Sequence, residues 1–126
     1  MVRRKILIVD DEPTLVEMAK TILEETGCYE VVGVSQPEKA LRAAQAFEPD
    51  LALLDIQMPG RDGSAVAADI EADPNLAHTK IVFFSSAITC DEMTQYGDTI
   101  GGYPYILKPV APETLIKRVA EELEKS

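Results

Sequence analysis

The chain has 126 residues, of which 22 are Asp or Glu and 12 are Lys or Arg, so its net charge is −10. This length suits a single domain over residues 1–126, and the charge opposes direct binding to nucleic acid, which depends on Lys and Arg. No apolar run approaches the roughly 20 residues of a membrane span, and acidic residues 10–12 come too early for the apolar core of a signal peptide. We therefore expect a cytoplasmic protein that is not inserted in a membrane.

The first two predicted elements are a strand over residues 5–9 and the helix that follows it. The strand is a continuous apolar run, which indicates burial on both faces as in a parallel sheet, and it ends in Asp10 and Asp11. Pro13 suits the first turn of the helix, where its missing N–H is not needed, and Gly27 ends the helix. Two carboxylates therefore stand between the first strand and the first helix.

A short strand over residues 29–34 and a second helix come next. The helix is predicted to start at Ser35 or Gln36, to carry Pro37 in its first turn and to end before Pro49. Because its apolar residues recur at helical spacing, we expect one face of this helix to lie in the core.

The third predicted strand, over residues 51–55, ends in Asp55. It is an unbroken apolar run between two turn signals, Pro49-Asp50 and Pro59-Gly60, so we expect it to be buried on both faces. A carboxylate is costly to bury unless it is paired, and the carboxyl edge of an open parallel sheet is where such folds bind ligands. Asp55 is therefore the first candidate functional residue.

A third helix and a fourth strand follow. Ser64 is predicted to cap the helix after Gly63, and residues 73–75 to break it. The strand over residues 80–87 is another continuous apolar run, and it ends in small hydroxyl residues that include Ser86.

The next segment is predicted to contain a fourth helix and a fifth strand. Apolar residues such as Ile100 lie at helical spacing within residues 89–102, but three glycines lower the helix propensity by up to roughly 1 kcal/mol each. We therefore expect a short or mobile helix there. Residues 103–108 form a short strand, and Pro104 places this strand at a sheet edge because proline lacks a ladder donor.

A last helix begins at Pro112, and the charged residues 121–126 are expected to lie in solvent. Five strands alternating with five helices predict a doubly wound α/β domain, in which right-handed crossovers bring the carboxyl ends of all parallel strands to one edge. The residues at or just past these ends, which we expect to converge on one pocket, are Asp10, Asp11, Asp55, Ser86 and Lys108.

Such a pocket would suit a metal ion and a phosphoryl group. Three carboxylates within a few ångströms repel one another unless a cation lies among them, and oxygen ligands without His or Cys favour Mg²⁺. The ammonium of Lys108 and the hydroxyl of Ser86 would complete a site for a dianionic tetrahedral group on Asp55.

The ordered set of these motifs resembles the receiver domain of two-component response regulators over nearly the whole chain. The matching segments are residues 6–13, 53–63, 86–87 and 105–109. The resemblance implies a flavodoxin-like fold, with a doubly wound five-stranded parallel sheet in the order 2-1-3-4-5 and five helices.

The resemblance also implies a role for each site residue. Asp55 would be the phosphoacceptor, and Asp11 and Asp55 would bind Mg²⁺ directly together with the backbone carbonyl of Gln57. Asp10 would act on the metal mainly through water, and Lys108 would contact the phosphoryl oxygens.

The same family uses a conformational switch. Ser86 would move toward the phosphoryl group and Tyr105 would turn inward, which changes a surface made by the fourth helix, the fifth strand and the last helix. The partners implied are a sensor histidine kinase or a phosphotransfer protein and a downstream protein effector. The resemblance also allows a homodimer through the face between the fourth and last helices.

Two other functions compete with this one. A magnesium-dependent phosphatase with an aspartyl intermediate usually carries a second Asp two residues after the nucleophile, whereas Asp55 is followed by Ile56 and Gln57. A pseudo-receiver would bind proteins without being phosphorylated. We expect a phosphoacceptor that assists its own phosphorylation and dephosphorylation rather than an enzyme. Whether the chain stands alone or comes from a longer regulator stays open.

Overall fold

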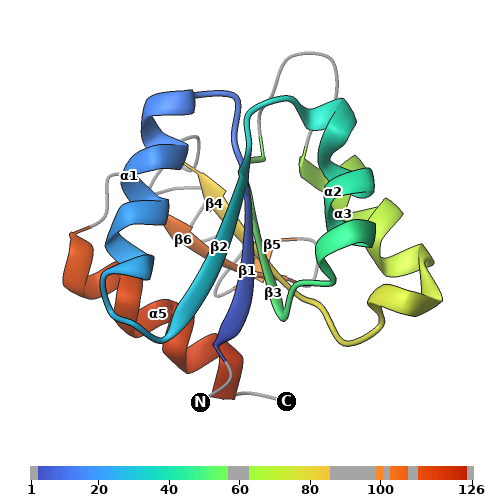
Figure 1. The fold of residues 1–126 in the computed structure, drawn as a ribbon. Helices are drawn as coiled ribbons and strands as arrows, with labels where there is room; N and C mark the ends of the chain where they lie inside the picture. The colour runs from blue at the N-terminus through green and yellow to red at the C-terminus, as the bar shows by residue number, and fades with distance from the viewer. Residues whose placement is uncertain (1–2, 57–62, 86–98, 101–102, 108–110, 125–126) are drawn as a thin grey trace.

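The computed structural model describes residues 3–56, 63–85, 99–100, 103–107 and 111–124. Figure 1 shows a central twisted sheet with α1 and α5 on one face and α2 and α3 on the other. The helices are α1 (Pro13–Glu24), α2 (Ala40–Phe47), α3 (Gly63–Ala72) and α5 (Pro112–Glu124), with 3-10 turns over Pro37–Lys39 and Pro74–Leu76. The strands are β1 (Arg4–Val9), β2 (Tyr29–Val34), β3 (Leu51–Leu54), β4 (Lys80–Ser85), β5 (Thr99–Ile100) and β6 (Tyr103–Leu107).

The sheet confirms the predicted fold class. Its order is β2-β1-β3-β4-β6-β5, and the first five of these strands pair in parallel, which is the predicted order 2-1-3-4-5. The last strand is an addition, because β5 pairs with β6 in the antiparallel sense and places Thr99 opposite Pro104. The prediction that Pro104 places its strand at the sheet edge was therefore wrong: β6 is the last parallel strand, but the edge is the short strand β5 that pairs with it.

One prediction in this region was wrong. Ile100 was expected on the fourth helix, whereas it belongs to the two-residue strand β5. The rest of the segment predicted as that helix, residues 89–98 and 101–102, lies outside the described residues. Within the described residues the chain forms four α-helices.

Two apolar layers hold the sheet between the helices. The alternation of side chains along a strand explains why both faces are buried, since Ile6 and Ile8 pack with α1 and α5 while Leu7 and Val9 pack with α2 and α3. All four residues of β3 have no exposed surface. Burying one such aliphatic side chain stabilises the fold by about 1.5–3 kcal/mol.

Two local boundaries differ from the predictions. Helix α3 begins at Gly63, so Ser64 lies inside the first turn and is not the residue before the helix. Strand β3 ends at Leu54, and Asp55 follows it, although the Asp55 N–H still donates to the carbonyl of Val9 across 2.9 Å. Asp55 therefore remains tied to the end of the sheet.

The end of α5 also differs from the prediction of a solvated tail. Glu122 is only 1% exposed, because it lies on the same helix face as the buried Leu115 and Val119. Its Oε2 atom is 4.0 Å from Nη1 of Arg118. The described residues contain no helix that is both long enough and apolar enough to cross a membrane.

Candidate metal centre at the carboxyl edge of the sheet

Three carboxylates gather at the carboxyl edge of the sheet. Asp10 follows β1, Asp11 stands next to it, and Asp55 follows β3, and one carboxylate oxygen from each lies within 4.8 Å of the others. Strands β1 and β3 are parallel neighbours with Val9 opposite Leu54, which is why their ends bring these acids together. The structure thus places three of the five residues predicted to converge in one cluster.

The cluster is largely removed from solvent. Asp10 is 1% exposed and Asp55 is 7% exposed, while Asp11 is partly exposed. Buried charges of one sign repel each other strongly because little water screens them. The cluster therefore suits a cation, and its exclusively oxygen donor set fits Mg²⁺ better than a metal that prefers nitrogen or sulfur.

Backbone hydrogen bonds hold the two buried acids in place. The N–H of Asp10 donates to the carbonyl of Val34 on β2 across 3.1 Å, and the N–H of Asp55 donates to Val9 across 2.9 Å. Oδ1 of Asp10 also accepts the N–H of Glu12 across 3.0 Å, at the point where the chain turns into α1. Asp10 is thus fixed both through its main chain and through its side chain.

Gly63 brings the start of α3 against the backbone of Asp55. Its N–H donates to the carbonyl of Ile56 across 2.8 Å, which connects the start of α3 to the residue after Asp55. A Cβ atom at Gly63 would collide with the carbonyl oxygen of Asp55 and lie 3.0 Å from Cα of Ile56. Sequence reasoning treated Gly63 only as part of a motif, and a glycine at the start of a helix was the available signal of this close approach.

Of the remaining predicted site residues, the structure describes only Tyr105. Gln57, Ser86 and Lys108 lie outside the described residues. Tyr105, in β6, is half-buried and packs on the apolar layer under α2 and α3. Its carbonyl oxygen accepts a hydrogen bond of 2.9 Å from Nη2 of Arg118, which connects β6 to α5.

A second tyrosine of β6 has an altered acidity. Burial raises the pKa of Tyr103 to about 12, and a hydrogen bond with Glu71 of α3 acts in the same direction. The Tyr103 ring also packs edge-on against Phe83, with 5.5 Å between the ring centroids. Tyr103 therefore links β6 to α3 as a neutral phenol.

Comparison with known proteins shows one family for the chain. Residues 6–120 match the model of the response regulator receiver domain. The chain is 32% identical over 124 residues to the DNA-binding response regulator MtrA of Mycolicibacterium smegmatis, a match that covers 98% of this chain and 52% of MtrA. It is 34% identical over 126 residues to the alkaline phosphatase synthesis transcriptional regulatory protein PhoP of Bacillus subtilis, covering 98% of this chain and 50% of PhoP.

The fold agrees with this match. The chemotaxis protein CheY4 of Vibrio cholerae superposes with a TM-score of 0.82 and 27% identity, covering 95% of this chain and 98% of CheY4. The chain spans about half the length of the two curated relatives, and the match to CheY4 extends over nearly all of both chains. The chain belongs to the response regulator receiver domain family, as its sheet order and its matched residues both show.

Proposed function

We propose that the chain is a two-component response regulator that accepts a phosphoryl group on Asp55. The observation that carries this proposal is the cluster of Asp10, Asp11 and Asp55, whose carboxylate oxygens lie within 4.8 Å of one another at the carboxyl edge of the sheet. In a doubly wound fold this edge is the expected place for a ligand site. The phosphoryl donor would be the phosphohistidine of a sensor kinase or of a phosphotransfer protein.

The acidic cluster supplies the metal ligands in this proposal. Asp11 and Asp55 would hold Mg²⁺ directly together with the carbonyl of Gln57, and Asp10 would orient a metal-bound water. When bound, Mg²⁺ offsets the negative charge of the carboxylates and of the incoming phosphoryl group. The hydrogen bonds from Asp10 to Val34 and from Asp55 to Val9 support the role, because they keep both carboxylates at fixed positions.

The switch would run through three further residues. Lys108 would pair with the phosphoryl oxygens, and Ser86 would donate its hydroxyl to them. Tyr105 would then turn inward and change the surface that a protein effector, or a second copy of the chain, recognises. The half-buried position of Tyr105 supports this step, because a ring that is neither fully packed nor fully solvated has room to change its orientation.

The output of this chain is proposed to be a protein contact. MtrA is named as a DNA-binding regulator, but this chain covers 52% of it. With a net charge of −10, the chain itself is ill suited to a phosphate backbone, so direct nucleic-acid binding is not part of the proposal. The chain would act as a phosphoacceptor and not as an enzyme with a separate substrate, and it would work in the cytoplasm with its kinase.

Intact mass spectrometry tests the proposal directly. The natural chain is incubated with acetyl phosphate, with and without Mg²⁺, next to Asp55→Asn and Asp73→Asn. Asp73→Asn is a matched control, because Asp73 lies outside the cluster and an asparagine can still accept the N–H of Asn75 that Asp73 accepts across 2.9 Å. We expect one phosphoryl adduct that requires Mg²⁺, persists in Asp73→Asn and is missing in Asp55→Asn.

The other outcomes separate the competing functions. A folded natural chain that binds Mg²⁺ but gains no adduct would refute phosphorylation and favour a pseudo-receiver that only binds proteins. Rapid consumption of acetyl phosphate over many turnovers would instead favour the phosphatase. An adduct that survives in Asp55→Asn would show that another residue is the acceptor.

A further inference from the structure

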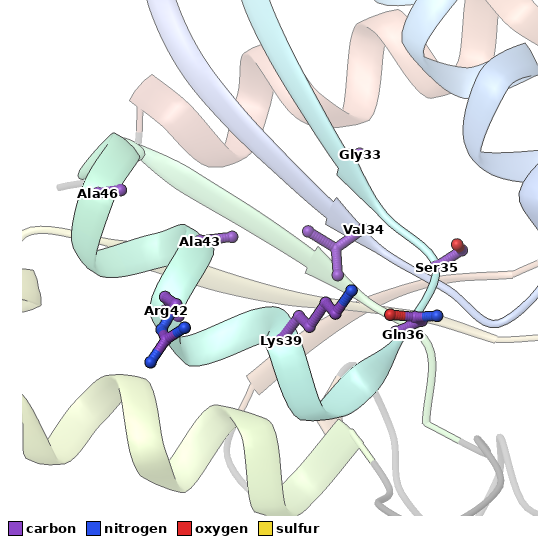
Figure 2. A pocket seen from close by; sticks show the side chains of 8 residues that line it. All are labelled: Gly33, Val34, Ser35, Gln36, Lys39, Arg42, Ala43 and Ala46. Atoms are coloured by element: carbon purple, nitrogen blue, oxygen red, sulfur yellow. The ribbon is translucent and has the colours of Figure 1, made fainter.

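A groove lies between helix α2 and the carboxyl end of the edge strand β2 (Figure 2). Its volume is about 600 Å³, and its apolar part is formed by Val34 of the strand and by Ala43 and Ala46 of the helix. Small-molecule sites in proteins commonly have volumes of roughly 300–1,000 Å³. Because the alanine side chains are short, the groove has room for a compact apolar group.

The polar part of this groove is cationic. Lys39, at the end of the turn before α2, points toward Val34 of the strand in Figure 2, whereas the side chain of Arg42, one helical turn later, extends away from the strand. None of the described residues that line the groove is acidic, although the whole chain carries a net charge of −10. The groove is therefore a local site of positive charge on an acidic protein, which favours anions over cations or neutral molecules.

The backbone of β2 adds a donor at the same place. The N–H groups of Arg4 and Asp10 donate to the carbonyls of Cys28, just before β2, and of Val34 at its end, so the backbone polar groups of the even-numbered residues face β1. Along a strand, the backbone N–H and C=O groups of successive residues point alternately to the two neighbouring sides of the sheet. The N–H of Gly33, an odd-numbered residue, therefore points away from β1 to the outer edge of the sheet. Gly33 also lines the groove.

The chain itself shows that this edge attracts a carboxylate. Like that of Gly33, the backbone N–H of Val31 points to the outer edge of the sheet, where it donates to Oε2 of Glu24 across 3.4 Å. An anion at Gly33 would repeat this contact two residues further along the strand, where Lys39 and Arg42 supply positive charge. Gly33 is a glycine for a separate reason, since a Cβ atom there would collide with the side chain of Val16 on the other face.

We propose that this groove binds a small organic anion. Its carboxylate, sulfonate or phosphate group would lie near Lys39 and the N–H of Gly33, its apolar body would cover Val34 and the two alanines, and Arg42 would add positive charge without contacting the anionic group. The site is distinct from the acidic cluster, which repels anions unless a metal is bound. It does not depend on phosphorylation of Asp55.

Titration with naphthalene-2-sulfonate, followed by the backbone amide resonances, tests the proposal. We expect saturable shifts centred on Gly33, Ser35 and Ala46, with a dissociation constant below about 1 mM. Lys39→Gln should weaken binding about fivefold, since a unit charge at a few ångströms contributes on the order of 1 kcal/mol even when exposed to water. Lys117→Gln, which removes an exposed cation from α5, is the matched control and should bind as the natural chain does.

Two further probes separate charge from apolar contact. Neutral 2-naphthol lacks the anionic group and inorganic sulfate lacks the apolar body, so each should bind more weakly than naphthalene-2-sulfonate. Ala46→Glu should abolish binding while Ala46→Gln retains it, and since Ala46 is exposed both variants should fold. Equal weakening in Lys39→Gln and Lys117→Gln would refute the site, because the probe would then respond only to the overall charge. Unsaturable or scattered shifts in the natural chain would refute it as well.

Discussion

Replacing Asp10 by Asn should stabilise the metal-free protein. The substitution removes one negative charge from the cluster of Asp10, Asp11 and Asp55 but leaves an oxygen that can still accept the N–H of Glu12. Two unit charges 4.8 Å apart repel by about 3.5 kcal/mol at an effective dielectric constant of about 20. Asp11 is partly exposed and Asp55 has further partners, so the net gain should be smaller, about 1–2 kcal/mol.

Urea unfolding in EDTA and in Mg²⁺ measures this effect. In EDTA the free energy of unfolding of Asp10→Asn should exceed that of the natural chain, and Mg²⁺ should stabilise the natural chain more than the variant, because binding only to the folded state adds to its stability. Asp73→Asn keeps the acceptor for Asn75 and loses only the exposed one that Nε2 of Gln45 contacts across 3.0 Å, so any change in its stability should be small and the same in EDTA and in Mg²⁺. If Asp10→Asn were less stable than the natural chain in EDTA, repulsion within the cluster would not be the dominant effect.

Three further changes test contacts around the site. Gly63→Ala should lower the free energy of unfolding by about 1–3 kcal/mol in urea and weaken Mg²⁺ binding, since its Cβ collides with the carbonyl of Asp55; unchanged Mg²⁺ affinity would contradict the link to the site. Arg118→Lys should lower the free energy of unfolding in urea by about 1 kcal/mol, because the 2.9 Å hydrogen bond to the carbonyl of Tyr105 depends on the guanidinium geometry. The raised pKa of Tyr103 contributes stability that is complete below pH 10 and is lost as the pH rises toward 12, because the unfolded phenol loses its proton first. Between pH 10 and 12 the free energy of unfolding should fall less with pH in Tyr103→Phe than in the natural chain. An equal fall in both would refute the raised pKa of Tyr103.

The sheet was predictable because a strand that is buried on both faces appears in the sequence as a continuous apolar run. Every residue of β3 is apolar and fully buried, and residues 6–9 of β1 are likewise apolar and buried. Once the strands were known, the rule that parallel strands present their carboxyl ends at one edge was enough to bring Asp10, Asp11 and Asp55 together.

Other features depend on contacts that a sequence pattern does not contain. In the sequence Glu122 looks like part of a solvated charged tail, yet it is buried beside Arg118. Whether it is solvated or buried depends on how α5 packs. The role of Gly63 requires knowing how closely α3 approaches Asp55. Strand β5 has two residues, which is too short to produce a periodic signal.

Among the residues that the structure describes, the sheet separates two apolar layers that share no side chain. Leu23 and Val119 belong to the layer under α1 and α5, whereas Ile70 and Val66 belong to the layer under α2 and α3. Energetic coupling between the layers must therefore pass through the strands themselves. Truncations such as Leu23→Ala and Ile70→Ala should be additive to within about 0.3–0.5 kcal/mol, and each layer can vary in evolution with little constraint from the other.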